Sequence, residues 1–461
     1  MKDRTSMSDI NRRGFLDRTR KAAFGLAGGV SILANPRSAR ATPANDRLVL
    51  AMIGVGSWGN ALAMGFLDRD DCQIGYVCEV NRQLHEPRAE AYAARQGGKR
   101  PKCVQDFREM LQDDSVDAAI VATPQHWHAL ATMLCCRAGK DVYCEKPQSH
   151  NGWEGRQAVA AARKYDRIVQ IGTHNRSAPY NQAAKRYLQE GKLGRVHLCR
   201  VFEQCHEANF QWGPDSDPPD TLDWDLWLGP APARQYNRAI PAQWRHLWDY
   251  SGGNMAYQGI HQIDLARWLC GVDYPSSVYC TGGRFHTQGG AETPDTQLAV
   301  FKFPEMLMTY EETLYTPYML RSDPGVRNDD IFPYWPQNAT RIELYGDQGV
   351  MYVGRMGGGW QVFVRTQNRQ PVVKDQMHGR YSAAEHREDF VRSVKSRQRP
   401  RADIEEGHRS MLLVHYANIS YRLGGRKLLI DPETEHVIDD PEAMGLFQRE
   451  YRKPWVVEEV L

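Results

Sequence analysis

The first part of the chain alternates continuous apolar runs with segments of helical periodicity. The apolar runs lie at residues 47–55, 73–78, 116–122, 141–144 and 168–172, and helical patterns fall between them at 60–67 and 155–165. Uninterrupted apolar runs are typical of strands that are buried on both faces of a parallel sheet. The pattern therefore predicts an α/β domain with a parallel sheet and crossover helices over residues 46–175.

The pattern changes after about residue 180. Longer strand-like segments lie at 194–204, 276–286, 297–315 and 340–364, followed by helical runs at 383–397 and 404–423. In one strand segment the apolar Ile342 and Leu344 alternate with charged residues. Successive strands of this kind predict an α+β domain with a large open, mostly antiparallel sheet over residues 176–435, and an irregular tail at 436–461.

Composition and charge narrow the class of protein. The chain has 461 residues, a net charge of +2 and 25% charged residues. Acidic and basic residues are interleaved, and no basic block stands beside aromatic residues, which argues against nucleic acid as a partner. The ten cysteines are scattered without paired C-x-x-C spacing, so we expect small core residues rather than a zinc site or a disulfide framework.

The N-terminal segment has the order of an export signal. Arg12-Arg13 precedes Phe15-Leu16, a weakly apolar run follows at 22–34, and Ala39-Arg40-Ala41 supplies the small residues of a cleavage site. We expect a twin-arginine signal at residues 1–41, and hence a periplasmic or secreted protein; a disordered basic arm is the alternative. The apolar run is too short to cross a bilayer, so no stable membrane insertion is expected.

A glycine-rich turn follows the first apolar run. Gly54-Val55-Gly56-Ser57-Trp58-Gly59 stands after a predicted strand and before a helical pattern that begins at Asn60. In this context glycines let backbone amides approach a pyrophosphate at the positive end of a helix. Glu79, at the end of the next strand, is placed to bind ribose hydroxyls and favours NAD over NADP. Arg82 could reverse that preference. The alternative for Glu79 is a solvated carboxylate at the end of a strand, with no role in binding.

One lysine marks the end of a later predicted strand. Lys146 follows the apolar run at 141–144 and lies between Glu145 and Pro147. Proline ends the strand because it donates no ladder hydrogen bond, and ligands of open α/β sheets bind at the carboxyl ends of the strands. The pattern therefore favours Lys146 as a catalytic residue, with a surface lysine as the alternative.

Taken in order, these motifs resemble those of one superfamily. The segments that carry the resemblance are Gly54–Gly59, Asp106-Phe107-Arg108, Ala122-Thr123-Pro124, Gly139-Lys140-Asp141-Val142, Glu145-Lys146-Pro147 and Gly259-Ile260-His261-Gln262-Ile263-Asp264. They are similar to the Gfo/Idh/MocA superfamily of nicotinamide-dependent sugar and cyclitol oxidoreductases, over essentially the whole mature chain. The resemblance implies a Rossmann dinucleotide-binding domain with NAD or NADP as cofactor. Exported members include glucose-fructose oxidoreductase and NAD-dependent glycoside hydrolases, which keep the dinucleotide bound through turnover.

The resemblance also implies roles for individual residues. Lys146 is expected to contact the substrate hydroxyl and the nicotinamide ribose, and His261 to take the hydroxyl proton as hydride leaves the carbon. An ammonium group stabilises a developing alkoxide and an imidazole accepts a proton near neutral pH, so the chemistry agrees. A satisfied core histidine is the alternative for His261. Cofactor contacts are expected from Gly54, Gly56, Ser57, Trp58, Gly59, Asn60, Glu79, Thr123, Pro124, His128, Glu145, Lys146 and Pro147.

One position departs from the family pattern. Many dehydrogenases of the family have an aspartate four residues before the histidine, where this chain has Tyr257. The change removes a carboxylate that would raise the basicity of the imidazole, and a phenol near Lys146 could itself transfer a proton. Tyr257 is therefore a third candidate catalytic residue, with a packing aromatic as the alternative. Asp264, on the same helical face as His261, is expected to orient the imidazole and to border the substrate.

Substrate contacts are expected from the second domain. Sugars need flat apolar faces and bidentate donors, so Trp244, Arg245 and the segment His174-Asn175-Arg176 are candidates. Residues 211–250, rich in Pro, Asp and Trp, are predicted to form an ordered insertion over the site, and its tryptophans either bind substrate or only hold the insertion in place. No third ligand accompanies His261 and Asp264, so no metal site is predicted.

Three functions fit this sequence. The first is an exported NAD(P)-dependent oxidoreductase with tightly bound cofactor, acting on a secondary hydroxyl of a sugar, glycoside or cyclitol. The second is a redox-neutral glycoside hydrolase or lyase, in which transient oxidation at C3 acidifies the C2 proton, the aglycone is eliminated and the ketone is reduced again. The third is a non-catalytic sugar-binding protein, against which the intact Lys146 and His261 argue. The expected partners are a carbohydrate, the twin-arginine export machinery and further copies of the chain in a homo-oligomer.

Overall fold

A computed structural model describes residues 47–205, 210–320, 324–365, 370–381 and 383–460. The predicted export signal at residues 1–41 lies outside the described residues. No helix in the described ranges has the length and the apolar character needed to cross a bilayer. All ten cysteines fall within the described ranges as free thiols, and most of them are buried.

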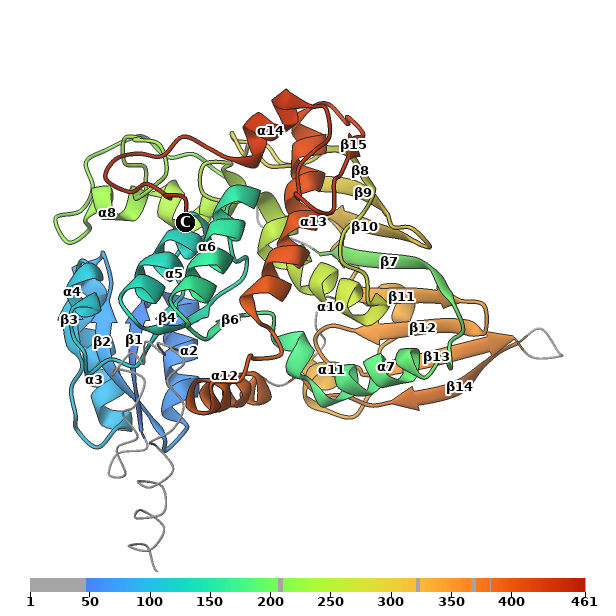
Figure 1. Cartoon of the computed structure of the whole chain (residues 1–461), viewed down its shortest axis with the longest axis horizontal. Coiled ribbons are helices and arrows are strands. Elements are labelled where there is room, and N and C mark those ends of the chain that lie inside the picture. The colour runs from blue at the N-terminus through green and yellow to red at the C-terminus, as the bar shows by residue number, and fades with distance from the viewer. Residues whose placement is uncertain (1–46, 206–209, 321–323, 366–369, 382, 461) are drawn as a thin grey trace, which may run out of the picture. The chain divides into compact units, whose positions relative to one another are not determined.

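The first domain is built on a six-stranded parallel sheet in the order β3-β2-β1-β4-β5-β6 (Figure 1). Its strands are β1 Leu48–Ile53, β2 Cys72–Cys78, β3 Lys102–Val104, β4 Ala118–Val121, β5 Asp141–Cys144 and β6 Val169–Ile171. Its helices are α2 Ser57–Leu67, α3 His85–Arg95, α4 Arg108–Leu111, α5 His128–Arg137 and α6 Gly152–Lys164. The chain crosses from β3 to β4 on the far side of β1, so the carboxyl ends of β1 and β4 border a crevice where α/β sheets bind ligands.

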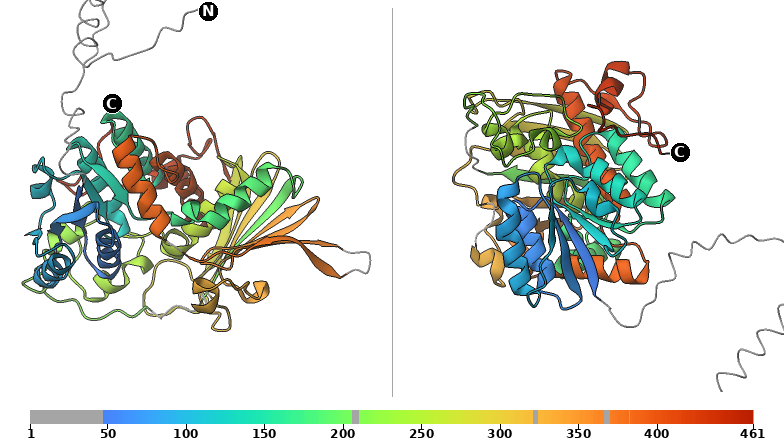
Figure 2. Two further views of the ribbon diagram at one scale, coloured as in Figure 1. Left: turned by 90° about the horizontal axis from the view of Figure 1, so that it is seen from below. Right: turned by 90° about the vertical axis from the view of Figure 1, so that its left-hand side faces the viewer.

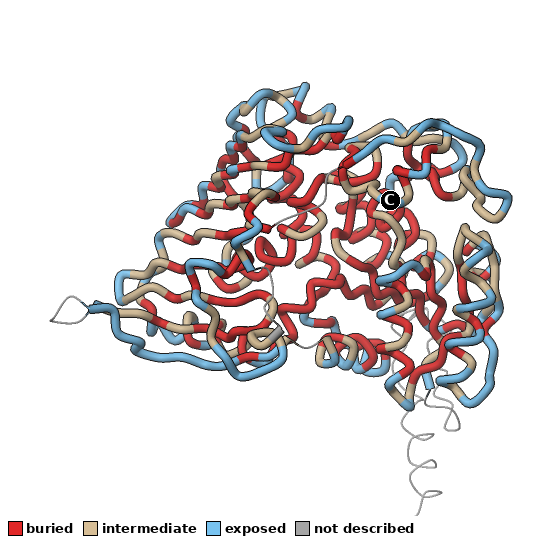
Figure 3. The backbone as a smooth tube through the Cα atoms, turned by 180° about the vertical axis from the view of Figure 1, so that it is seen from behind, coloured by how far each residue is buried: buried red, intermediate tan, exposed pale blue. Residues whose placement is uncertain are grey.

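The central strands of this sheet are covered on both faces. Strands β4 and β5 have no exposed position, and Figure 3 shows buried residues along the parallel strands. This burial explains their unbroken apolar sequences, because neither face meets water. The predicted Rossmann domain is thereby confirmed as a fold.

The second domain contains a nine-stranded sheet in the order β14-β13-β12-β11-β7-β10-β9-β8-β15. Its strands are β7 Val196–Gln204, β8 Ser277–Gly283, β9 Thr296–Lys302, β10 Leu307–Thr313, β11 Arg341–Gly346, β12 Gly349–Gly354, β13 Trp360–Arg365, β14 Pro371–Met377 and β15 Leu428–Leu429. Neighbouring strands are antiparallel except β7 and β10, which are parallel. The predicted mostly antiparallel sheet is confirmed, although the segments at 297–315 and 340–364 each fold as separate strands joined by reversals.

Helices pack on one face of this large sheet (Figure 2). They are α7 Pro179–Gln189, α10 Ile260–Cys270 and α13 Ile404–Arg422, and α12 Ala384–Ser396 precedes α13. The tail that was expected to be irregular contains a further helix, α14 Pro441–Phe447, which begins after an Asp440 side chain that accepts a hydrogen bond from the backbone of Ala443. Asp at this position caps the exposed amides of a helix start, a signal that is present in the sequence.

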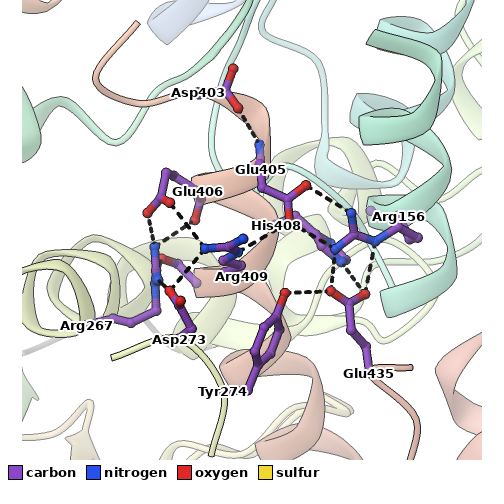
Figure 4. Close-up of polar contacts among 12 residues, drawn as sticks. Arg156, Arg267, Asp273, Tyr274, Asp403, Glu405, Glu406, His408, Arg409 and Glu435 are labelled. Atoms are coloured by element: carbon purple, nitrogen blue, oxygen red, sulfur yellow. Dashed lines mark hydrogen bonds and ion pairs between the residues drawn. The ribbon is translucent and has the colours of Figure 1, made fainter. Parts of the chain in front are cut away.

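A polar network joins the two domains around the start of α13 (Figure 4). Arg156 on α6 donates hydrogen bonds to Glu405 on α13 and to Glu435 in the C-terminal loop. His408 and Tyr274 also bond to Glu435. Burial opposes ionisation of Glu435, but the His408 and Arg156 hydrogen bonds hold its pKa well below the ordinary value. The buried carboxylate therefore stays charged and ties α6 to α13.

The end of the chain completes the core of the first domain. Phe390 of α12 packs edge-on against Phe66 of α2 and against Tyr143 of β5. Trp455 packs against Trp127, which lies between β4 and α5. Residues far beyond the predicted boundary at 175 are thus part of the packing of the first domain.

An ordered insertion lies beside the carboxyl ends of the parallel strands. It contains α8 Trp224–Leu228, α9 Ala239–Gln243 and the short helix η5 Trp244–His246. Backbone hydrogen bonds fasten it to the segment after β2, since Arg82 donates to Thr221 and Asp223 donates to Val80. The insertion therefore adds a wall above the crevice of the parallel sheet.

Candidate active site

A cleft of ≈ 930 Å³ opens at the carboxyl ends of β1, β4 and β5. The turns after these strands form its floor, the insertion forms one wall, and segments of the second domain form the other. A cavity of this size, with both apolar and polar groups in its walls, suits an extended organic ligand. Three parts of the chain that lie far apart in sequence therefore meet in one binding site.

The glycine turn leaves room for a ligand on the floor of this cleft. Gly54 has φ +86°, and a Cβ there would lie 2.8 Å from the Ala122 carbonyl oxygen; a Cβ on Gly59 would lie 2.2 Å from the Gly54 oxygen. At Gly56 a Cβ would meet no protein atom within 4 Å, yet Gly56 lines the cleft at the start of α2. Gly54 and Gly59 are thus needed by the fold itself, whereas Gly56 keeps open the space next to the helix N-terminus. The turn fits a dinucleotide pyrophosphate.

Glu79 lines the cleft beside this turn. Its carboxylate accepts hydrogen bonds of 3.0 Å from the backbone amides of Val55 and Asn81. These bonds fix the carboxylate next to the glycine turn, where a ribose would lie. Arg82 is directed elsewhere, because its guanidinium donates to the Asp220 carbonyl oxygen at 2.7 Å in the insertion.

The turns after β4 and β5 are held together by His128. Its ring nitrogens lie 2.6 Å from the Pro147 carbonyl oxygen and 2.8 Å from the Thr123 carbonyl oxygen. Burial lowers the pKa of His128. The predicted cofactor-binding residues that line the cleft are Gly54, Gly56, Ser57, Trp58, Gly59, Glu79, Thr123, Pro124, His128, Glu145 and Lys146. Asn60 and Pro147 lie behind this surface: the Asn60 amide donates within the helix to Gly56, and Pro147 contributes its carbonyl to His128.

Lys146 is held against the opposite wall by Tyr257. Its Nζ donates to the Tyr257 carbonyl oxygen at 2.6 Å and lies 4.4 Å from the centre of the phenol ring. Tyr257 belongs to a short π-helical turn, Met255–Gly259, that leads into α10. π-Turns within helices are frequent at functional sites. The phenol and the ammonium group therefore both border the cleft.

Glu145 is a buried carboxylate next to Lys146 in the lining of the cleft. It accepts hydrogen bonds from the Lys146 amide at 3.2 Å and from the Tyr143 hydroxyl at 3.3 Å. Burial raises the pKa of Glu145, and the charge of Lys146 opposes this rise. Gly172 makes room for the carboxylate, since a Cβ there would lie 2.7 Å from Oε1. The acidic neighbour thus lies beside the lysine in the lining of the cleft.

His261 and His174 form a pair of imidazoles in the same cleft. Their ring centres are 4.8 Å apart, and both residues line the cavity. Burial lowers the pKa of His261 well below its ordinary value, and the charges of Arg355 and Lys146 act in the same direction. His174 shows the same direction and the same leading cause, burial. Both rings are therefore neutral near pH 7, and a neutral imidazole can accept a proton.

Asp264 does not orient His261 as we expected. Its carboxylate accepts hydrogen bonds from Nε of Arg176 at 2.9 and 3.1 Å, from Nη2 of Arg176 at 2.8 Å, and from the Ser410 hydroxyl at 2.7 Å. The His261 Nδ1 atom is buried without a hydrogen-bond partner among the described residues. Arg176 and Asp264 are 1% and 0% exposed and lie outside the cleft wall. They form a buried ion pair away from the lining of the cleft, so neither is placed to contact a substrate.

The other residues predicted to contact substrate fall into two groups, those that line the cleft and those that are buried outside it. Trp244 and Arg245 line the cleft, where Trp244 packs edge-on against the Tyr257 ring at 5.7 Å and the Arg245 guanidinium lies 5.8 Å from it. His174 also lines the cleft, whereas the neighbouring Asn175 is buried and bonds through its carbonyl oxygen to Asn181. The short helix η4 His174–Ser177 explains the difference, since it points successive side chains in different directions.

The sequence patterns missed other residues of the cleft. Arg327 lines it from the short helix α11 Pro324–Asn328, and Arg355 and Tyr381 line it from loops of the second domain. No motif spacing marks these positions, because each reaches the cleft only through the order of strands in the large sheet. The glycine run at 357–359 is the one local signal near Arg355, and it indicates a tight turn rather than a site.

Comparisons with known proteins agree with this architecture. Residues 48–173 match a model described as the oxidoreductase family with an NAD-binding Rossmann fold. Residues 226–352 match a GFO/IDH/MocA C-terminal domain, and residues 336–457 match the C-terminal alpha/beta domain of the oxidoreductase family. Consecutive parts of the chain thus match domains of one family.

Individual relatives are distant in sequence. The chain is 24% identical to myo-inositol 2-dehydrogenase of Thermotoga maritima, over 80% of this chain and 95% of that protein. It is 27% identical to an uncharacterized oxidoreductase of Bacillus subtilis over 42% of this chain and 47% of that protein. It is also 27% identical to mouse trans-1,2-dihydrobenzene-1,2-diol dehydrogenase, over 47% of this chain and 54% of that protein. The matches with these last two relatives span about half of their lengths.

Solved structures share the fold. A levoglucosan dehydrogenase in complex with NADH and levoglucosan superposes with a TM-score of 0.62 at 19% identity, covering 83% of this chain and 99% of that one. The aldose-aldose oxidoreductase of Caulobacter crescentus, complexed with glycerol, gives a TM-score of 0.62 at 17% identity, covering 83% of this chain and 100% of that one. From the matched domain models, with the glycine turn, Lys146 and His261 in one cleft, we conclude that the chain belongs to the Gfo/Idh/MocA family of oxidoreductases.

Proposed function

We propose that the protein is an NAD(P)-dependent oxidoreductase that acts on a secondary hydroxyl of a sugar, glycoside or cyclitol. The observation that carries this proposal is the meeting of Lys146 and His261 in the cleft that begins at the glycine turn. The names of distant relatives, a myo-inositol dehydrogenase and a levoglucosan dehydrogenase, support the substrate class. Glu79, fixed by two backbone amides beside the turn, supports NAD over NADP.

Each part of the proposed reaction can be assigned to residues of the cleft. A bound nicotinamide supplies the acceptor for the hydride of the carbinol carbon. Lys146 carries the positive charge that stabilises the alkoxide as the O–H bond breaks. His261, neutral because burial lowers its pKa, accepts the hydroxyl proton. Trp244 and Tyr257 offer aromatic faces against which a sugar ring can pack.

We further propose that the cofactor is held tightly. The insertion passes next to Glu79, the carboxylate that we expect to bind the ribose. An isolated β-bridge there pairs Asn81 with Leu222 of the insertion. Pro219, Leu222 and Trp227 of the insertion line the same cleft as the glycine turn. A dinucleotide in this cleft would be covered by an ordered segment that must open before the cofactor leaves. Tight retention suits a protein exported in the folded state, which is the localisation that we propose from the N-terminal sequence.

A redox-neutral glycoside hydrolase or lyase is the second candidate. Tyr257 favours it, because the phenol borders the cleft within 4.4 Å of Lys146 and provides a second proton-transferring group beside His261. In that reaction hydride taken from C3 returns to the same molecule after elimination and addition of water. The two functions differ in product, since the hydrolase releases an aglycone without net NADH.

The test begins with the purified protein. Acid denaturation should release close to one equivalent of dinucleotide per chain, identified by chromatography and mass. The protein with its bound cofactor should then form NADH on addition of sugars or cyclitols, or release an aglycone from glycosides without net NADH. Neither bound nor bindable dinucleotide, or turnover that is unchanged in Lys146→Ala, would contradict the proposed function.

A further inference from the structure

Two buried glutamates lie opposite each other on neighbouring strands of the large sheet. Glu312 on β10 and Glu203 on β7 are partners in the parallel register of these strands. They are 3% and 0% exposed, and the residues two positions earlier, Tyr310 and Val201, belong to the hydrophobic core that includes α10. Two carboxylates buried side by side disfavour each other's ionisation, so their other partners decide which of them is charged.

Glu203 has a cation beside it. Its carboxylate lies 3.8 Å from Nη1 of Arg355 and accepts a hydrogen bond from the side chain of Gln262, the residue after His261. Arg355 also donates through Nη2 to Gln258 at 2.9 Å. Glu203 is therefore a paired carboxylate that connects β7 to the segment around the candidate catalytic histidine.

The hydrogen bonds of Glu312 come from neutral groups. Oε2 accepts from the Tyr310 hydroxyl at 2.5 Å and from Nδ2 of Asn254 at 3.1 Å. Oε1 is buried without a hydrogen-bond partner among the described residues. An ionised carboxylate with an unbonded buried oxygen is costly, and a neutral acid avoids most of that cost. The contacts therefore favour an uncharged Glu312.

The electrostatics of the surroundings agree with this. Burial raises the pKa of Glu312 to about 8; its two hydrogen bonds oppose the rise, and the charges of Glu203 and Asp295 add to it. Asp295 is held charged by backbone amides, which lower its pKa although burial opposes them. Burial raises the pKa of both Tyr310 and Cys280, which also face Glu312, so neither is charged near neutral pH.

The two bonds of Glu312 reach both ends of the π-helical turn. Asn254 immediately precedes the turn. At the other end the Tyr310 hydroxyl lies against Gly259, where a Cβ would be 2.2 Å from the hydroxyl oxygen. Between these ends lies Tyr257, whose carbonyl oxygen accepts the hydrogen bond of the candidate catalytic lysine. One side chain thus contacts the start and, through Tyr310, the end of the segment that holds the lysine.

Taking the proposed oxidoreduction as its basis, we propose that Glu312 is a positioning residue that, as an uncharged acid, fixes the π-helical turn and through it the ammonium group of Lys146. Ionisation puts a second negative charge beside Glu203 with no second cation among the described partners, which loosens the turn. Glu312 also lines a second cavity of ≈ 390 Å³ that shares no residue with the cleft, and its proton exchanges from that side. Activity is therefore present at neutral pH and falls as the pH rises through the pKa of Glu312.

Infrared difference spectroscopy tests the protonation state in the full-length protein saturated with NAD. Between about pH 6 and about pH 10, above the ordinary glutamate pKa, the wild type should show the C=O stretch of a protonated carboxylic acid, lost near pH 8. Glu312→Gln should lack this band. Glu311→Gln is the matched control and should keep it, because Glu311 pairs with Arg200. A wild type without the band, or a band that persists in Glu312→Gln, would overturn the proposal.

Pulse acetylation read by mass spectrometry measures how firmly Lys146 is held. Its labelling is compared at equal pH with that of Lys102, an exposed lysine in the same chain. Glu312→Leu should raise the relative labelling of Lys146 about threefold or more, the effect of one lost hydrogen bond, whereas Glu312→Gln should match the wild type at about pH 7. At about pH 9, above the pKa of Glu312, the Gln variant should be labelled more slowly than the wild type. This last comparison decides if the Leu variant does not fold; equal labelling there would contradict the proposal.

Turnover connects the position of Lys146 with the reaction. NADH formation is measured with myo-inositol, levoglucosan and glucose as probes. The wild-type kcat should fall above about pH 8, and Glu312→Gln should keep its kcat through this range with unchanged NAD affinity. A basic limb that is the same in Glu312→Gln would assign it to another group and overturn the proposal. Labelling as expected with no NADH from any probe would overturn the oxidoreductase and leave the positioning role, whereas turnover with labelling that does not respond to Glu312 would do the reverse.

Discussion

The Nζ atom of Lys146 lies 2.6 Å from the backbone carbonyl oxygen of Tyr257, across 111 residues of sequence. The acceptor is a neutral carbonyl, so the bond positions the ammonium group without cancelling its charge. The same contact joins the turn after β5 to the π-helical turn that precedes His261. The hydrogen bond therefore links the proposed charge stabiliser to the segment that leads into the helix of the proposed base.

Lys146→Ala should lower kcat by about 10²- to 10³-fold, because removal of one preorganised electrostatic group has effects of this size. The measurement is single-turnover reduction of the bound cofactor, followed by NADH fluorescence. Lys102→Ala is the control and should retain full activity, since Lys102 is exposed and pairs with Asp113 at the edge of the parallel sheet. Comparable rates in the Lys146 variant and the wild type would exclude the proposed role.

His261 should act as a base well below neutral pH. Its lowered pKa means that the ring is deprotonated, and therefore competent, above that pKa, and activity is lost as the pH falls through it. The acid limb of log kcat/KM should consequently lie below pH 6.5, the ordinary histidine value. A pH–rate profile in saturating cofactor checks this. His261→Gln should remove the acid limb and lower kcat about 10²- to 10⁴-fold; a limb that stays in place after the substitution would assign it to another group.

Substitutions at two glycines of the turn should have different effects, one on folding and the other on cofactor binding. Gly59→Ala places a Cβ 2.2 Å from the Gly54 oxygen and should lower the free energy of unfolding, measured in urea. Gly56→Ala meets open space within the protein and should fold normally, yet bind NAD at least about tenfold more weakly because the methyl group enters the ligand space.

Gly445→Ala provides the comparison for these variants. Gly445 lies in α14, and a Cβ there meets no atom within 4 Å, so stability should not fall and NAD affinity should remain unchanged. If Gly56→Ala bound NAD as tightly as the wild type does, the pyrophosphate could not lie at the start of α2.

Arg176 should matter for stability and not for substrate specificity. Arg176→Met leaves the Asp264 carboxylate buried without its ion-pair partner, and this should cost about 3–5 kcal/mol of unfolding free energy. Urea unfolding measures the loss, and KM of the remaining folded enzyme should be unchanged.

A double variant tests the coupling. Arg176→Met combined with Asp264→Leu should be less destabilised than the sum of the single variants, because no charge is left unpaired. A changed KM without loss of stability would instead place Arg176 in contact with the substrate.

The sequence was sufficient for the parallel sheet and for the floor of the cleft. Gly54, Glu79 and Lys146 each stand at the end of a strand, and strand ends of a doubly wound sheet converge by topology alone. Arg355 and Tyr381 could not be predicted in this way. Their approach depends on the pairing of β11 with β7, which brings the loop after β12 to the first domain, and strand pairing over such separations has no local signal.

The expectation that Asp264 orients His261 failed for a different reason. Asp264 and His261 are three residues apart, so helical periodicity places them on one face. Arg176 and Ser410, which reach Asp264 from other elements, turn its carboxylate away from the imidazole. Periodicity predicts which residues are neighbours, and only the tertiary partners decide which of them bond.

The packing of Trp455 on the first domain has a consequence for folding during synthesis. Its ring packs against Trp127 of the first domain, Arg108 lies over it at 4.3 Å, and the amide of Val460 donates to Gln157. The first domain therefore cannot complete this part of its packing until residues 455–460 have been synthesised. Trp127 lines the cleft, so a nascent chain that has made only the first 175 residues would present this wall of the cleft without the ring that supports it.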